Sequence, residues 1–259
     1  MLEKIMRRAV PSCVAACLVI LACWAAPAWA AEEETSAMRR WAKENDISDK
    51  EGNQRVKVRA TYWSNEYVAE LIASEAEKNL WTRDEVENYK YTLMKTLSLH
   101  DSIAFHISFY VEGVPMYAQP FDKHITLMIG KQKFSPSDYD KRFNFKISGP
   151  RDGMVNFPRY DPKTGKDLLE GAKDIRLILD ASISQALSPR GDLLWVWDVT
   201  QDKGDALGDG LAMDRLEVDR LLRRMEKLKG ERDGLQSQLD ELDSELAQVD
   251  ARIEELQSR

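Results

Sequence analysis

The C-terminal residues 211–259 carry a heptad repeat, and no other feature of this chain constrains its fold as strongly. From Val218 onward, apolar residues recur in alternating steps of three and four. This 3.5-residue period keeps one seam of an α-helix facing a partner helix in a left-handed supercoil. The a positions are Val218, Met225, Arg232, Leu239, Leu246 and Ile253, and the d positions are Leu221, Leu228, Leu235, Leu242, Val249 and Leu256. Since only Arg232 interrupts this apolar seam, the pattern predicts an α-helical coiled coil over residues 211–259.

A second helix must cover the seam, because a helix of roughly 70 Å, at about 1.5 Å per residue, cannot bury it on one small domain. In a parallel pair of copies, each g residue faces the e residue five positions on. That geometry sets Arg224 against Lys229 and Glu245 against Asp250, which are like charges in both cases. We therefore expect self-association or a partner protein, and the flanking charges disfavour parallel self-pairing.

Charge is also distributed unevenly along this segment. Residues 211–229 carry a net charge of +2, whereas residues 230–259 carry −6. Two antiparallel arrangements would bring the basic half over the acidic half: a pair of chains, or a hairpin within one chain around Gly230 to Gly234. Each glycine weakens a helix interior by about 1 kcal/mol relative to alanine. The heptad register nevertheless continues unbroken across both glycines, which favours one continuous helix and leaves the hairpin as the rival.

Residues 1–30 have the features of a secretory signal peptide: a basic start, an apolar run over residues 9–26 and the ending Ala28-Trp29-Ala30. All three cysteines, Cys13, Cys17 and Cys23, lie within it, so a chain cleaved after Ala30 has no thiol. The small residues before Cys17 resemble a lipoprotein cleavage site, but the apolar residues after it disfavour a lipid anchor. We expect an exported protein of the periplasm or outer cell envelope, with no transmembrane helix after cleavage.

The cleaved chain would hold 34 basic and 43 acidic residues, a net charge of −9. Nucleic acids and anionic lipid surfaces attract basic proteins. The acidic balance therefore argues against nucleic acid and against anionic membranes as partners.

The rest of the sequence predicts one globular domain over residues 54–200. Residues 31–53 are mostly charged and are expected to form an exposed lead-in. Helices are expected over residues 64–80 and 83–99, where Thr82 and Glu85 have the spacing of a capping box.

Alternating apolar residues predict seven strands, of which residues 103–111 are the clearest. The others are expected over residues 56–62, 124–129, 143–147, 154–157, 175–181 and 193–199. No helical stretch separates the later strands, so a parallel sheet is disfavoured. The predicted fold is α+β: an antiparallel β-sandwich-like domain of about seven strands with an inserted pair of helices, then a linker over residues 201–210 and the long C-terminal α-helical coiled coil.

Candidate catalytic groups are few. His100, Asp101 and Ser102 are triad residue types side by side, but consecutive side chains rarely converge on one proton path, so a solvated turn is the expectation there. His106 falls on the polar side of its strand, where an exposed or cross-strand histidine is expected. We predict no catalytic residue, no metal site and no cofactor; the alternative is an envelope hydrolase using His100 or His106 with a carboxylate.

The segment 157–166, FPRYDPKTGK, is the most distinctive loop. Its turn-forming residues place Arg159 and Tyr160 at the mouth of the loop. With Tyr139, these two residues form a candidate ligand-binding set for a carbohydrate or a peptide. The competing interpretation is a tight connection between strands.

Taken together, these patterns favour a non-catalytic, exported protein of the cell envelope. Its globular domain would serve binding or structure, and the coiled coil would tether or oligomerise it. The sequence does not identify the ligand.

Overall fold

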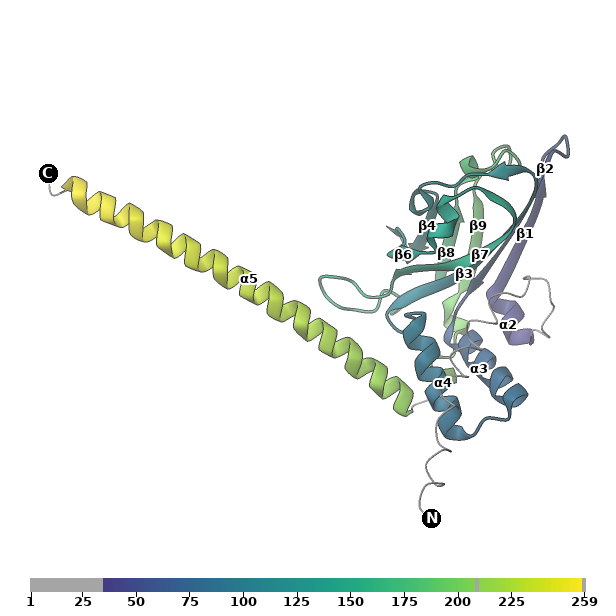
Figure 1. Cartoon of the computed structure of the whole chain (residues 1–259), viewed down its shortest axis with the longest axis horizontal. Helices are drawn as coiled ribbons and strands as arrows, with labels where there is room; N and C mark the ends of the chain where they lie inside the picture. The colour runs from purple at the N-terminus through teal and green to yellow at the C-terminus, as the bar shows by residue number, and fades with distance from the viewer. Residues whose placement is uncertain (1–34, 208–209, 258–259) are drawn as a thin grey trace, which may run out of the picture. The chain divides into compact units, whose positions relative to one another are not determined.

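The computed structural model describes residues 35–207 and 210–257 (Figure 1). The predicted signal peptide and the cysteines lie outside the described residues. Contacts divide the chain into two compact units. The sheet unit holds the described residues up to Leu80 and those from Asp101 to Leu207, and the helical unit holds Trp81–His100 and the described residues from Gly210 onward. Residues 81–100 group with the C-terminal helix, and the prediction of one globular domain over residues 54–200 stays a prediction.

The first sheet of the sheet unit has five strands in the order β1-β2-β3-β7-β6 (Figure 1). All its pairings are antiparallel. The strands are β1 (Ala42–Ser48), β2 (Gln54–Tyr62), β3 (Ser102–Met116), β6 (Asp138–Tyr139) and β7 (Ile147–Pro158). The long pair of β3 and β7, with His106 opposite Met154, forms the centre of this sheet.

The second sheet has four antiparallel strands in the order β5-β4-β8-β9. They are β4 (Ile125–Ile129), β5 (Gln132–Phe134), β8 (Asp174–Leu179) and β9 (Leu193–Asp198). Burial alternates along β9, so that Leu193, Trp195 and Trp197 point inward. The two tryptophans are therefore core residues, as their alternation indicates.

Both sheets contribute to one apolar core. Phe105 of the first sheet lies 5.2 Å, between ring centroids, from Trp197 of the second. Tyr62 contacts both rings. Replacing a fully buried aromatic residue here by alanine would cost about 3–5 kcal/mol. The α+β class and the two antiparallel sheets are thus confirmed.

Residues 35–53 of the predicted lead-in contain a helix and a strand, so the expectation of an exposed segment does not hold for this part of it. Helix α2 (Ser36–Trp41) leads into β1, which pairs with β2 along its whole length. Trp41 is 1% exposed, and its indole N–H donates to Glu66 Oε2 at 2.8 Å. The charged side chains of β1 are tolerated because this strand lies at the edge of the sheet, where charged residues are common.

The predicted strand over residues 143–147 is also wrong. Residues Lys141–Asn144 form a 3₁₀ helix, η3, which begins where the Asp140 side chain accepts the N–H of Arg142. The apolar alternation in this segment misleads because Phe143 is buried whereas Phe145 is 66% exposed. Strand β7 begins at Ile147 and includes the whole strand that was predicted over residues 154–157.

Helix α3 (Asn65–Asn79) belongs to the sheet unit and packs against α2 and the 3₁₀ helix η6 (Gly204–Leu207). Asp202 accepts the N–H groups of Asn65 at 3.0 Å and Glu66 at 2.9 Å. A carboxylate in this position satisfies orphan amides and complements the positive end of the helix. The predicted linker over residues 201–210 is thus partly folded, with Leu207 buried; residues 208–209 lie outside the described part.

The helical unit consists of α4 (Arg83–Thr96) and α5 (Leu211–Gln257). Helix α4 begins with the predicted capping box between Thr82 and Glu85. Helix α5 runs without interruption through Gly230 and Gly234 (Figure 1). The hairpin alternative is therefore wrong for this chain. The structure shows one long helix, and the coiled coil itself requires a second helix.

Candidate interaction surface

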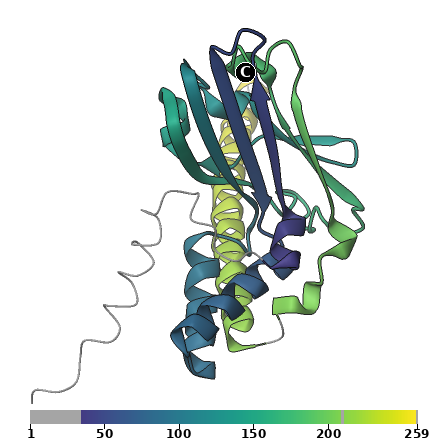
Figure 2. The same cartoon turned by 90° about the vertical axis from the view of Figure 1, so that its right-hand side faces the viewer.

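The first turns of α5 lie beside α4 (Figure 2). Ala212 and Leu216 are each 1% exposed. The backbone N–H of Ala212 donates to Glu87 Oε2 at 3.1 Å, so a side chain of α4 satisfies one of the orphan amides at the start of α5. The base of the long helix is thus fixed to α4.

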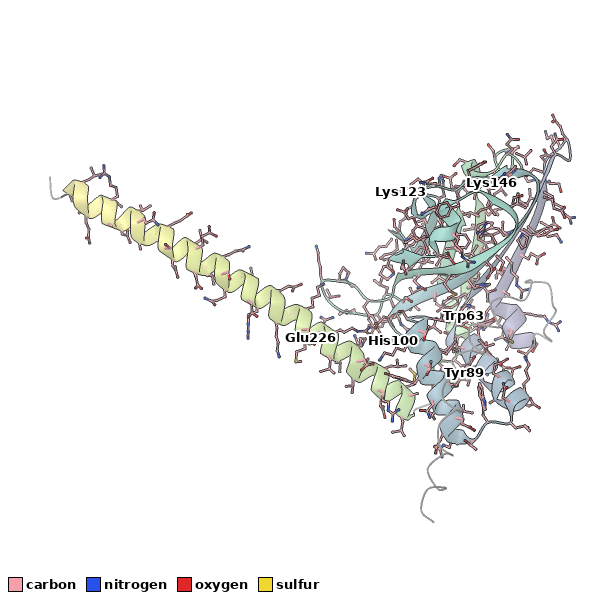
Figure 3. All side chains as sticks on the ribbon, in the orientation of Figure 1. Trp63, Tyr89, His100, Lys123, Lys146 and Glu226 are labelled. Atoms are coloured by element: carbon pink, nitrogen blue, oxygen red, sulfur yellow. The ribbon has the colours of Figure 1, made fainter. Side chains whose placement is uncertain are left out.

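Three further contacts extend this attachment by two turns. Asp219 accepts hydrogen bonds from Lys95 Nζ at 3.0 Å and from the Tyr91 hydroxyl at 3.1 Å. The hydrogen bond from Lys95, then that from Tyr91, lowers the pKa of the Asp219 carboxyl below its usual range. Arg223 Nη2 lies 3.0 Å from His100 Nε2. Figure 3 labels His100 beside the first part of α5. His100 is 9% exposed, so the expected solvated turn is wrong at this residue.

The α5 residues of this attachment, to α4 and to His100 beyond its end, occupy the b and f positions of the heptad. These are Ala212, Leu216, Asp219 and Arg223, spaced at four, three and four residues. At about 100° per residue, the middle of this docking face lies about 150° around the helix from the middle of the a/d seam. Helix α5 therefore attaches to α4 with one side and presents the apolar seam on the other.

The apolar seam is exposed along its whole length. Its eleven apolar residues have exposed fractions between 43% and 61%. Monomeric proteins rarely expose continuous apolar stripes of this extent, and such surfaces are typical of interaction sites. The seam residues are Val218, Leu221, Met225, Leu228, Leu235, Leu239, Leu242, Leu246, Val249, Ile253 and Leu256, with Arg232 among them.

The polar and flexible residues at the middle of α5 have distinct positions. Gly230 and Gly234 occupy f and c positions, on the outer side of the helix, and a Cβ atom added to either would meet no atom within 4 Å. Arg232 occupies an a position in the seam, and its Nη2 donates to Asp233 Oδ1 at 2.7 Å. The glycines therefore leave the seam intact, and the one break in the seam is the arginine.

The residues of the candidate ligand-binding set fall in two separate contact clusters. Arg159 donates to Asp167 Oδ2 at 2.9 Å, and Tyr160 forms a backbone bridge with Asp167. The Asp161 carboxylate accepts two N–H groups within the same loop, which closes it as a tight connection. Arg159 is thereby held in an internal ion pair.

Tyr139 belongs to the other cluster. Its ring lies 5.6 Å from that of Phe121, and its hydroxyl contacts the side chains of Asn144 and Asp122 at 3.3 Å. Lys141 Nζ lies 3.7 Å from the centre of the Tyr139 ring. Ligand binding by Arg159, Tyr160 and Tyr139 stays a prediction, and these contacts give each residue a role within the fold.

His106 is a cross-strand histidine, one of the two placements expected for it. Its Nε2 lies 3.3 Å from Asp152 Oδ2 on the neighbouring strand. The hydrogen bond from His106 lowers the pKa of the Asp152 carboxyl. The pair joins β3 to β7 at a half-exposed position.

Sequence reasoning missed one Ser–His contact. Ser182 Oγ lies 3.5 Å from His124 Nδ1, although the residues are far apart in the sequence. Asp180 accepts the N–H of Ser182 at 2.7 Å and caps a 3₁₀ helix. Within residues 35–207 and 210–257, no group of three or more His, Cys, Asp or Glu side chains could hold a metal ion.

Comparison with protein families, with curated proteins and with solved structures found no match for this chain. Among the described residues, no helix is both long enough and apolar enough to cross a membrane. The candidate functional surface is therefore defined by the chain's own geometry, as the exposed a/d seam of α5.

Proposed function

We propose that this chain is an exported, non-catalytic protein of the cell envelope, in which α5 joins the sheet unit into an assembly. The sheet unit is then a binding or structural module, and α5 forms a coiled coil through its a/d seam. The heptad period, the exposed seam and the features of a signal peptide in residues 1–30 support this proposal.

One observation carries the proposal: the docking face and the seam lie on nearly opposite sides of α5. A helix that served only to complete its own fold would bury its most apolar side. Here Leu216 is buried against the chain, whereas Leu228 and Leu235 remain more than half exposed. The unpaired apolar side is thus left for another helix.

Light scattering of seam variants tests this function. Leu235→Asp places a carboxylate in the seam, and Ser237→Asp places the same carboxylate on the outer side of α5. We expect the chain from Ala31 to self-associate, Leu235→Asp to abolish association and Ser237→Asp to leave it unchanged. A monomeric parent chain at all concentrations would contradict the proposal.

Export is tested separately. Expression of the full chain followed by N-terminal sequencing of the envelope fraction is expected to give a protein that begins at Ala31. A protein that keeps residues 1–30 in the cytosol would contradict this part of the proposal.

An envelope hydrolase is the second candidate, favoured by the 3.3 Å contact between His106 and Asp152. A half-exposed histidine beside a carboxylate is a possible general base. Hydrolysis of a panel of ester substrates that His106→Ala abolishes would support it, whereas equal rates for both proteins would remove it.

A further inference from the structure

We propose that α5 pairs with α5 of a second copy of this chain in antiparallel orientation, with the twofold axis between Asp233 and Gly234. This inference rests on the proposed self-association and adds the partner, the orientation and the register. It follows from the continuity of α5 together with the charges that flank its seam.

This register sets the whole of α5 against its counterpart. In an antiparallel pair, an a residue of one helix packs beside a d residue of the other. Arg232 then faces Leu235 of the second copy, close to the axis. The next four layers are apolar on both sides: Val218 with Val249, Leu221 with Leu246, Met225 with Leu242, and Leu228 with Leu239. At the end of the pair Leu211 faces Leu256, and Asp214 faces Ile253 as the second polar layer.

The flanking residues are complementary in the same register. Because the twofold axis is perpendicular to the helices, g residues face g residues and e residues face e residues. Every charged pair so formed is of opposite sign, and symmetry makes each occur twice. These pairs are Arg224 with Glu245, Glu217 with Arg252, and Arg215 with Asp250. The other flanking pairs, Glu231 with Gln238, Lys229 with Gln236 and Leu222 with Asp243, contain no like charges.

The competing arrangements juxtapose like charges. The parallel pair opposes Arg224 to Lys229, as noted above. An antiparallel pair shifted by one heptad toward the N-terminus brings Glu231 against its own copy, and Lys229 likewise. A shift by one heptad toward the C-terminus opposes Arg224 to Arg252 and Glu231 to Glu245. Charges at these positions select partner and orientation in coiled coils.

The attachment to α4 leaves this arrangement open. Ala212 and Leu216, at the b and f positions at the start of α5, are buried in the attachment to α4. Val218 and Leu221 of the same turns remain about half exposed. The N-terminal heptads of the seam are therefore available to the C-terminal heptads of the second copy.

Charge reversal distinguishes the orientations by the sign of its effect. In the proposed pair, Arg224→Glu turns two attractions into repulsions, and we expect the dissociation constant of the dimer to rise about tenfold. The double change R224E/E245R restores opposite charges and is expected to recover most of the affinity. Lys227→Glu, at an outer c position, is the matched control with the same change in net charge. In a parallel pair, Arg224→Glu would instead face Lys229 and tighten the dimer.

Pulsed dipolar spectroscopy measures the register directly. Single cysteines introduced as S237C, S244C or A251C occupy successive f positions, and the chain from Ala31 contains no other cysteine. That chain retains every described residue. With 1.5 Å of rise per residue, the axial distance between the two labels is expected to be about 10, 32 and 53 Å in turn.

The outcomes separate this inference from the proposed function. Equal distances at all three positions would show a parallel dimer and overturn the orientation, with self-association preserved. Distances that increase toward the C-terminus but begin about 10 Å higher or lower would place the axis one half-heptad away and overturn the register. The absence of any dipolar signal would overturn both the pairing and the proposed function.

Discussion

Replacing Gly230 and Gly234 by alanine is expected to stabilise α5. Both glycines lie in the helix interior, and a glycine there is about 1 kcal/mol less favourable than alanine. An added Cβ would meet no atom within 4 Å at either position, so no clash offsets the gain. The double variant is therefore expected to be about 2 kcal/mol more stable per chain.

The assay for this prediction is the loss of helical circular dichroism on heating, at several protein concentrations. An isolated helix is marginally stable, so the unfolding of the distal part of α5 is coupled to dissociation and its midpoint depends on concentration. Ala251→Gly, at an outer f position like that of Gly230, is the reverse control and should lower stability by about 1 kcal/mol. A double alanine variant that melts at or below the parent temperature would refute a continuous helix and would indicate a bend at residues 230–234.

Three further predictions follow from single contacts. Arg232→Leu completes the apolar seam, and because a polar a residue fixes orientation at a cost in stability, it is expected to raise the melting temperature of α5. It should also broaden the distribution of the spin-label distances measured by dipolar spectroscopy. An unchanged melting temperature would contradict this. Asp202→Ala removes the acceptor of the Asn65 and Glu66 amides and should cost about 1 kcal/mol in chemical unfolding of the sheet unit, with Asp198→Ala as control. The pKa of the Asp219 carboxyl is lowered in the folded chain from its ordinary value of 3.8. The ionised carboxylate therefore stabilises the attachment of α5 to α4 at pH values above 3.8, and this stabilisation is lost as the pH falls through the lowered pKa. Hydrogen exchange of the α4 amides should show this loss, and Asp219→Asn should remove the pH dependence.

The seam of α5 was predictable because its period extends over six heptads and no local propensity opposes it. The docking face was not predictable, because it is short and chemically mixed. It consists of two small apolar contacts, a carboxylate and an arginine, at Ala212, Leu216, Asp219 and Arg223. At the start of the helix the Glu87 carboxylate accepts an amide of α5. A hydrogen bond between the first turn of one helix and a side chain of a distant segment leaves no periodic pattern in the sequence.

Strand β1 was missed for a different reason. Its sequence, AKENDIS, has low strand propensity and a single apolar residue of any size, Ile47. Pairing with β2 overrides that propensity, since strand preference depends strongly on tertiary context. The contact of His106 with Asp152 illustrates the same limit, because the register of β3 and β7 is set by the pairing of the two strands.

The molar mass of the chain from Ala31, measured by sedimentation equilibrium beside a chain that ends at Glu226, tests the central claim most directly. The shorter chain keeps the contacts of α5 with α4 and that of Arg223 with His100, and it loses most of the seam. We predict a dimer for the longer chain and a monomer for the shorter one at the same concentrations. Equal monomeric masses for the two chains would contradict the account.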